Sequence, residues 1–243
     1  MNSCAAHRGW SGKAPENTLA AMRLALGEYY VDWMELDVQL TKDGVPVVIH
    51  DFTVNRTTNG RGRVKDKTLA DIRALDAGSW YSREFAGERV PTLEEVLTLA
   101  KGRCKLNIEL KNRAGLYPGI ESKVAELILA HGMECDTVIT SFDVKTIREV
   151  RRIHPEMPTG LIIDSRPSDL LQRLREYGAD FLSISYKVLT AEFAEEAIRS
   201  GFTVMAWTVN EVRDLYRVTK MHPEIIICTN EPDRFKQVML PNG

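Results

Sequence analysis

The stretch WMELDVQLTKDGVPVVIHD (33–51) decides the fold, because it contains a strand, a tight turn and a returning strand. Asp43-Gly44 is a common hairpin turn, and the apolar run after it predicts a second strand that ends near His50. The period of two in the first strand places Glu35 and Asp37 on one face. The opposite face carries Met34, Leu36 and Val38. An apolar strand that points two carboxylates in one direction indicates a functional site.

Strand-like and helix-like segments alternate on both sides of this stretch. The predicted strands cover residues 4–7, 31–40, 105–111, 137–142, 158–164, 180–185, 203–209 and 224–229. The predicted helices cover residues 16–30, 92–100, 120–132, 144–154, 168–178, 191–201, 211–220 and 232–240. With the hairpin taken as an extension of the second strand, these segments form eight βα units, which predict a closed (β/α)₈ TIM barrel. An open doubly wound sheet is the alternative, but no G-x-G-x-x-G follows the first strand.

The composition indicates a single domain over residues 1–243, with a hydrophobic fraction of 44% that is ordinary for a globular protein. A net charge of −2 and the absence of a basic run argue against nucleic acid or an anionic membrane surface as a partner. We see no signal peptide and no apolar run of ~18 residues, so we expect no membrane insertion. Four scattered cysteines favour a cytoplasmic location. The oligomeric state is left open, with a homodimer as one option.

Residues 52–91 break the repeat. They contain many turn-forming residues, several Arg and Lys, and one short helical run. A loop of this length in a compact domain is usually functional or disordered. Because it follows the hairpin of the second strand, we expect it to cover one mouth of the barrel as a lid. A tolerated surface insertion is the alternative.

The five histidines divide by position. His131, His154 and His222 come at the ends of helical runs, before Gly or Pro, where a histidine interacts with the negative end of the helix dipole. In a barrel those helix ends lie at the bottom, away from the active face. His7 and His50 instead stand at the carboxyl ends of predicted strands. They are therefore the two candidates for proton transfer.

A third carboxylate joins the two of the second strand. In KLNIELK (105–111), the alternation places Asn107, Glu109 and Lys111 on one face. The inward faces of the second and third barrel strands are neighbours. We therefore expect Glu109 to converge with Glu35 and Asp37.

Three carboxylates cannot share a site as anions unless some take up protons or a cation lies among them. Oxygen ligands without cysteine or clustered histidine favour Mg²⁺ or Ca²⁺ over Zn²⁺. The alternative is a set of inward salt bridges, in which Glu109 pairs with Lys111 or Arg8. The placement of His7 and His50 at the same rim favours the metal. A cation, two imidazoles and two basic side chains indicate chemistry on a phosphate ester.

Seven motifs then occur in order. They are HRG-x₅-PENT (7–18), ELDVQLTKDG (35–44), HD (50–51), RTTNGRG (56–62), VPTLEEVL (90–97), IELK (108–111) and AWTVN (206–210). With them the chain resembles the glycerophosphodiester phosphodiesterase family over nearly its whole length and at the family's spacing. One motif such as PENT is weak, whereas the ordered set is very specific.

The resemblance implies a TIM-barrel phosphodiesterase that cleaves glycerophosphodiesters, the deacylated phospholipids, to sn-glycerol 3-phosphate and an alcohol. It implies that Glu35, Asp37 and Glu109 bind a divalent metal. It also implies that His7 and His50 act as general acid and base.

The remaining implications concern the substrate. The matches to Arg8 and Lys111 hold the phosphate, and Trp207 lines the glycerol pocket. Residues 52–91 correspond to the family's small insertion domain. The chain departs from the family at TNEP (229–232), where T-D-x-P is usual. Asn230 removes a carboxylate there and leaves the three metal ligands unaffected.

Other classes of protein are less consistent with the sequence. An amidohydrolase-type barrel normally shows H-x-H on its first strand, and an enolase-type barrel spreads its metal carboxylates over three strands. Sphingomyelinase D is a closer competitor among phosphodiesterases on similar barrels. A non-catalytic module is the third option, but neither histidine and none of the three carboxylates is lost. The preferred alcohol, the metal and the histidine that acts first stay open.

Overall fold

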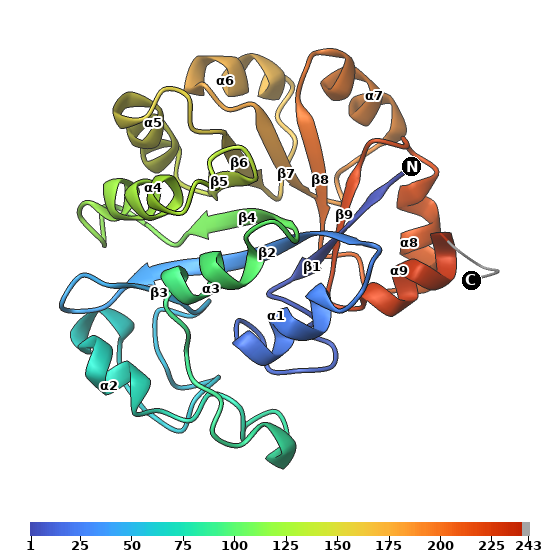
Figure 1. Cartoon of the computed structure of the whole chain (residues 1–243). Helices are drawn as coiled ribbons and strands as arrows, with labels where there is room; N and C mark the ends of the chain where they lie inside the picture. The colour runs from blue at the N-terminus through green and yellow to red at the C-terminus, as the bar shows by residue number, and fades with distance from the viewer. Residues whose placement is uncertain (240–243) are drawn as a thin grey trace.

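Figure 1 shows the computed structural model of the chain, in which the strands form a barrel surrounded by helices. The structure describes residues 1–239. β1 pairs in parallel with both β2 and β9, which closes the barrel. The barrel strands are β1 (Ser3–His7), β2 (Val31–Leu40), β4 (Lys105–Leu110), β5 (Thr137–Ser141), β6 (Thr159–Ile163), β7 (Phe181–Ser185), β8 (Thr203–Trp207) and β9 (Ile226–Thr229). The predicted TIM barrel is confirmed.

Helices follow the barrel strands in the predicted order. They are α1 (Leu19–Leu26), α2 (Leu69–Arg73), α3 (Leu93–Ala100), α4 (Ile120–Ala130), α5 (Val144–Ile153), α6 (Leu170–Tyr177), α7 (Ala191–Arg199), α8 (Val212–Thr219) and α9 (Pro232–Met239), with 3₁₀ turns η1 (Val64–Asp66) and η2 (Arg83–Phe85). Residue 240, the last of the final predicted helix, lies outside the described residues. Within residues 1–239, none of the helices is long and apolar enough to cross a membrane.

Side-chain caps define where several of these helices begin. Thr92 and Glu95 form a reciprocal capping box at the start of α3. Thr18 accepts a hydrogen bond from the Ala21 backbone at the start of α1. Because this cap fixes the first turn of α1, it also fixes the course of the preceding residues 8–17, which carry part of the candidate site.

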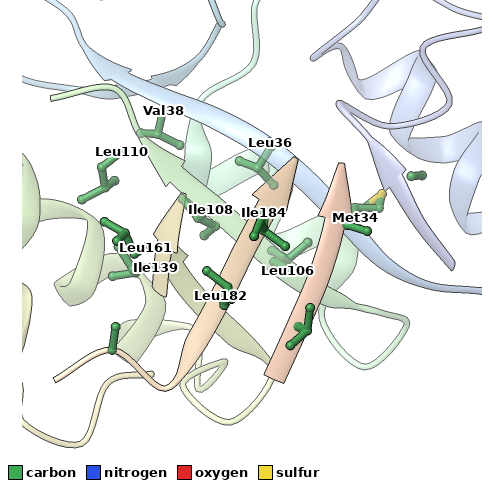
Figure 2. Close-up of a cluster of buried hydrophobic side chains, with 14 of the residues drawn as sticks. Met34, Leu36, Val38, Leu106, Ile108, Leu110, Ile139, Leu161, Leu182 and Ile184 are labelled. Atoms are coloured by element: carbon green, nitrogen blue, oxygen red, sulfur yellow. The ribbon is translucent and has the colours of Figure 1, made fainter. Parts of the chain in front are cut away.

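The main core lies between the barrel and its helices. Figure 2 shows its strand contribution, which consists of the outward-facing apolar side chains. Met34, Leu36 and Val38 belong to this layer and are fully buried, as the alternation in β2 predicted. A smaller apolar cluster includes Phe181 and Met205, and Trp33 packs against it. These two clusters take up the apolar side chains of the strands. The polar side chains that point into the barrel gather toward the carboxyl ends of the strands.

Residues 52–91 have a small core of their own, formed with the hairpin. β3 (Pro46–Val48) pairs antiparallel with β2, and Val47 and Ile49 pack against apolar residues of this stretch. In Figure 1 the stretch, which includes α2, lies at the lower left of the view, beyond β3. Tyr81 donates a hydrogen bond to the Gly12 carbonyl at 2.7 Å. The apolar side of the hairpin thus holds this stretch in place, and its role as a lid over the mouth stays a prediction.

Candidate active site

The strand register brings the predicted carboxylates together. Glu35 lies opposite His7 on β1, and Asp37 lies opposite Glu109 on β4. Glu35, Asp37 and Glu109 are all buried, and one carboxylate oxygen of each lies within 4.8 Å of the others. Their convergence, predicted from alternation on neighbouring strands, is confirmed.

Two basic side chains reach the same group. Lys111 Nζ lies 2.9 Å from Asp37 Oδ1 and 2.7 Å from Glu109 Oε1. Arg8 Nε lies 3.1 Å from Asp37 Oδ2, and Arg8 Nη1 lies 2.8 Å from Glu16 Oε1. The inward salt bridges of the alternative interpretation thus form, with Arg8 on Asp37 rather than on Glu109. These salt bridges offset the negative charge of the site only in part, because two basic side chains face three buried carboxylates.

The pKa values show where negative charge remains uncompensated. Burial raises the pKa of Asp37, but Lys111 and Arg8 outweigh that effect and hold it well below its usual range. Burial and the neighbouring Asp37 raise the pKa of Glu109 to about 7. The same causes raise the pKa of Glu35 well above its ordinary value. Buried oxygen donors with an excess of negative charge fit a hard divalent cation such as Mg²⁺ or Ca²⁺.

His7 ends β1 and lies beside these carboxylates. Its Nε2 is 3.6 Å from Glu35 Oε2, and its Nδ1 is 2.6 Å from Asn230 Oδ1. Burial and the charge of Arg8 lower the pKa of His7 to about 4. The chain then turns sharply, with φ of 58° at Arg8 and 74° at Gly9. A Cβ at Gly9 would lie 2.7 Å from the Ala21 carbonyl carbon, so the third residue of HRG must be glycine.

His50 follows β3 and is returned to the level of Asp37 by the hairpin, since Ile49 N–H donates to the Asp37 carbonyl at 2.9 Å. Its Nδ1 lies 2.7 Å from Asp51 Oδ1. Gln39 Nε2 lies within 3.0 Å of the carbonyl oxygens of three successive residues, Ile49, His50 and Asp51. This buried amide fixes the backbone from which the imidazole projects.

The other three histidines lie away from the carboxylates. His131 and His154 are the C-terminal caps of α4 and α5, as predicted. His222 lies beyond the end of α8, and its Nε2 is 3.3 Å from Glu195 Oε2. Its carbonyl accepts a hydrogen bond from Asn2, just before β1. This contact places His222 at the amino ends of the strands, at the bottom of the barrel.

Two adjoining cavities open at the carboxylates. The smaller, of about 140 Å³, is lined by His7, Arg8, Glu35, His50, Glu109, Lys111 and Trp207 among others. The larger, of about 610 Å³, shares Glu109, Lys111 and Phe142 with it and extends past Phe52. The indole N–H of Trp207 is buried without a hydrogen-bond partner in residues 1–239. The predicted site residues thus line the smaller cavity, except for Asp37, which contacts its lining residues Arg8 and Lys111.

Several supporting residues were not assigned from the sequence. Asn17 donates to Asp37 Oδ2 at 2.9 Å, and Tyr117 donates to Gln39 Oε1 at 2.7 Å. Asn230 contacts His7, although its replacement of a carboxylate was noted without a role. Gln39 could have been found, since it follows Asp37 by two residues on the inward face of β2. The others lie in loops, where no periodicity in the sequence indicates which way a side chain points.

A closed β/α barrel with carboxylates, two histidines and two basic side chains around one cavity defines a TIM-barrel phosphodiesterase. The model of the "Glycerophosphoryl diester phosphodiesterase family" matches residues 7–234, so this chain belongs to that family. The resemblance in the sequence is therefore confirmed, and the protein is an enzyme of the phosphodiester hydrolase class.

Relatives of the whole chain support this assignment. A glycerophosphodiester phosphodiesterase of Caldanaerobacter subterraneus is 41% identical over 242 residues, which are 98% of each chain. One of Bacillus subtilis is 34% identical and covers 96% of this chain and 85% of its own. A solved Oleispira antarctica phosphodiesterase, in complex with the product sn-glycerol-3-phosphate, superposes with a TM-score of 0.92 at 29% identity. It covers 98% of this chain and 97% of its own.

Proposed function

We propose that this protein hydrolyses glycerophosphodiesters to sn-glycerol 3-phosphate and an alcohol, in the breakdown of deacylated phospholipids. The observation that carries the proposal is the arrangement around the smaller cavity. Buried carboxylates, the two histidines, Arg8 and Lys111 all face a space of about 140 Å³. Such a combination suits a small anionic phosphate ester, because basic groups offset its charge while imidazoles transfer protons.

Glu35, Asp37 and Glu109 would hold the divalent cation. When bound, Mg²⁺ or Ca²⁺ supplies positive charge against the phosphate and lowers the pKa of a coordinated hydroxyl. Arg8 and Lys111 would bind the remaining phosphate oxygens, and both keep their positive charge since the pKa of each is raised by neighbouring carboxylates despite burial. Both Mg²⁺ and Ca²⁺ match the oxygen donors.

His7 and His50 would transfer the protons. Each has one ring nitrogen held by a neighbour, Nδ1 in both cases, which leaves Nε2 for the substrate. One imidazole takes a proton from the attacking hydroxyl while the other gives a proton to the departing alcohol. Trp207 would contact the glycerol unit with its ring and its unpaired N–H.

The nucleophile that we favour belongs to the substrate. The glycerol unit carries a hydroxyl next to the esterified carbon, already tethered to the phosphorus. Attack by this hydroxyl forms a P–O bond, breaks the bond to the alcohol and leaves a cyclic 1,2-phosphate. Water then opens the ring with the histidine roles exchanged. Tethering lowers a barrier by ~7–11 kcal/mol relative to bimolecular attack, whereas direct attack by water lacks that advantage.

The larger cavity would receive the alcohol. Phe52 and Phe142 line it, and Phe52 is the residue by which the stretch 52–91 reaches it. A role of this stretch in selecting the alcohol would therefore act through Phe52. Comparing Phe52→Ala with the unmodified enzyme across several alcohols tests this role, and unchanged ratios of kcat/KM would contradict it. The scattered cysteines of the sequence are the basis for placing the reaction in the cytoplasm.

The central experiment assays the purified protein on glycerophosphocholine, glycerophosphoethanolamine and glycerophosphoglycerol. The protein is first exhaustively chelated and then supplied with Mg²⁺ or Ca²⁺. We expect sn-glycerol 3-phosphate to be released only when a cation is present. Calorimetric titration of the chelated protein with each cation reports binding separately from activity. No turnover of any of the three substrates with either bound cation would contradict the proposal.

A further inference from the structure

Arg56 is the first residue of the RTTNGRG motif (56–62), which has no role in the site described above. Its guanidinium holds two carboxylates at once. Nη1 and Nη2 each lie 2.8 Å from an oxygen of Glu16, while Nε and Nη2 lie 2.8 and 3.0 Å from the two oxygens of Asp51. Both edges of the planar group are thus paired in the geometry that arginine forms with carboxylates.

Each of these carboxylates also holds a side chain of the site. Glu16 accepts a hydrogen bond from Arg8 Nη1 at 2.8 Å. Asp51 lies 2.7 Å from His50 Nδ1, and an ionised carboxylate can only accept, so Nδ1 carries the proton. Arg56 therefore connects the phosphate-binding Arg8 to the proton-transferring His50 through two carboxylates.

We propose that Arg56 is a positioning residue, which sets Arg8 and His50 relative to each other and leaves Nε2 of His50 toward the substrate. This inference rests on the proposed function. Arg56 does not line either of the two cavities, so it acts through Glu16 and Asp51 rather than on the substrate. It also gives the stretch 52–91 a catalytic contribution that does not depend on closing over the mouth.

The rest of the motif holds Arg56 in place. Thr58 donates to the Val54 carbonyl at 2.6 Å, and Gly62 N–H donates to Asn55 Oδ1 at 2.8 Å. Val54 N–H in turn donates to the Gly62 carbonyl at 3.0 Å, which closes the loop, and Val54 is buried in the small core. The loop is thus a compact unit from which the guanidinium projects toward Glu16 and Asp51.

Without Arg56 the two carboxylates would face each other, since both contact the same Nη2. Repulsion would move them apart and carry Arg8 and His50 with them. The pair with Arg56 adds little to folding stability, because its side chain is 44% exposed. A positioning role therefore predicts that Arg56→Ala loses activity with an unchanged Tm. A merely structural role predicts a lower Tm with little change in activity.

The test compares Arg56→Ala with Arg61→Ala, an exposed arginine of the same loop that lies outside the Glu16 and Asp51 pairs. Arg56→Ala should lower kcat/KM roughly 10- to 100-fold, mainly through kcat, as a small misplacement of catalytic groups does. Free guanidinium at low, non-denaturing concentration should restore part of the loss. Arg56→Lys should be intermediate, since an ammonium keeps the charge but cannot form both forks.

An NMR measurement tests the same positioning role of Arg56 in the absence of substrate. The His50 Nδ1 proton should be protected from exchange in the unmodified enzyme and in Arg61→Ala, and lose protection in Arg56→Ala. Equal kcat/KM for Arg56→Ala and Arg61→Ala would overturn the proposal, as would a loss of activity that parallels a loss of Tm. These outcomes require an active unmodified enzyme, so they are distinct from a failure of the proposed function, in which that enzyme turns over none of the substrates.

Discussion

The amide oxygen of Asn230 lies 2.6 Å from Nδ1 of His7. The imidazole donates its Nδ1 proton to this oxygen, which leaves Nε2 unprotonated and directed toward Glu35. Ser11 stands beside the pair, with Oγ 3.0 Å from the same amide oxygen. An amide can orient the ring as a carboxylate would, without adding negative charge to a site that already has three buried carboxylates.

Replacing Asn230 tests this orientation. Asn230→Ala should lower kcat roughly 10- to 100-fold, because a freely rotating ring seldom presents Nε2 to the substrate. Asn230→Asp should retain most of the activity, since a carboxylate also accepts the Nδ1 proton. Steady-state kinetics of both variants provide the measurement. Equal activity of Asn230→Ala and the unmodified enzyme would show that the ring is held by other contacts.

Metal binding should displace protons from the carboxylates. The pKa of Glu109 is raised to about 7, so Glu109 holds a proton at pH 6 in the absence of a cation, and burial and the neighbouring Asp37 also raise the pKa of Glu35. Titration with Mg²⁺ or Ca²⁺ at pH 6 should therefore release protons, and the affinity should rise with pH. Calorimetry in buffers of different ionisation enthalpy counts the protons.

Matched variants identify the source of these protons. Glu109→Gln, like Glu35→Gln and Asp37→Asn, should weaken cation binding and leave a folded barrel. Glu134→Gln, at an exposed glutamate, is the control and should change neither. Cation binding at full affinity in all three site variants would rule out this group as the metal site.

The histidines should separate into two classes on mutation. His7→Ala and His50→Ala should each lower kcat by ~10²–10⁴, the usual effect of removing a general acid or base. His154→Ala should change kcat little, because His154 caps α5 at the end remote from the site. Circular dichroism confirms that each variant is folded. A loss at His154 equal to that at His7 would contradict the division by barrel face.

Asp76 should make the stability of the stretch 52–91 depend on pH. Its carboxylate accepts backbone hydrogen bonds from Ser79, Gly87 and Gly78, and these bonds lower its pKa. A lowered folded-state pKa gives stabilisation that is complete above the unfolded value of ~3.9 and is lost as the pH falls below it.

Urea unfolding at neutral and acidic pH measures this effect. Asp76→Asn should be less stable than the unmodified protein at pH 7, and the difference should shrink as the pH falls below ~4, where Asp76 takes up a proton in the unfolded chain before it does so in the folded protein. Glu84→Gln, at an exposed carboxylate of the same stretch, should show no such trend. A difference in unfolding free energy between Asp76→Asn and the unmodified protein that is independent of pH would contradict this role of the ionised Asp76.

The barrel and its inward residues could be predicted because both follow from the periodic spacing of apolar residues in the sequence. β2 occupies residues 31–40, as predicted, and its alternation alone separates Glu35 and Asp37 from the outward apolar face. Parallel pairing of neighbouring strands then fixes which inward residues meet, and Glu109 indeed lies opposite Asp37. Closure of the barrel adds His7, since β1 pairs with β2.

The contacts that support the site could not be predicted in the same way. Arg56 reaches Glu16 across 40 positions of sequence, and its direction depends on how a loop packs on its own small core. The position of residues 52–91 depends on packing of the same kind. VPVVI (45–49) is apolar throughout, so the sequence does not show that Val47 and Ile49 pack against this stretch.

The nucleophile can be identified with a substrate analogue that lacks the glycerol hydroxyl next to the esterified carbon. In the tethered route this hydroxyl attacks phosphorus, and its proton passes to His7 or His50. The advantage of tethering is ~7–11 kcal/mol, so its removal should make kcat collapse. In the direct route water attacks, and the hydroxyl contributes only to binding. The deoxy analogue should then show mainly a raised KM.

Steady-state kinetics on the deoxy analogue and on its parent diester distinguish the two routes. Phosphorus NMR of the parent reaction adds a second measurement, because a cyclic 1,2-phosphate should accumulate transiently if its opening is slower than its formation. His7→Ala and His50→Ala should slow both formation and opening, since each imidazole serves once as acid and once as base. If the deoxy analogue turns over at near-normal kcat, the hydroxyl is not the nucleophile and water attacks the phosphodiester directly.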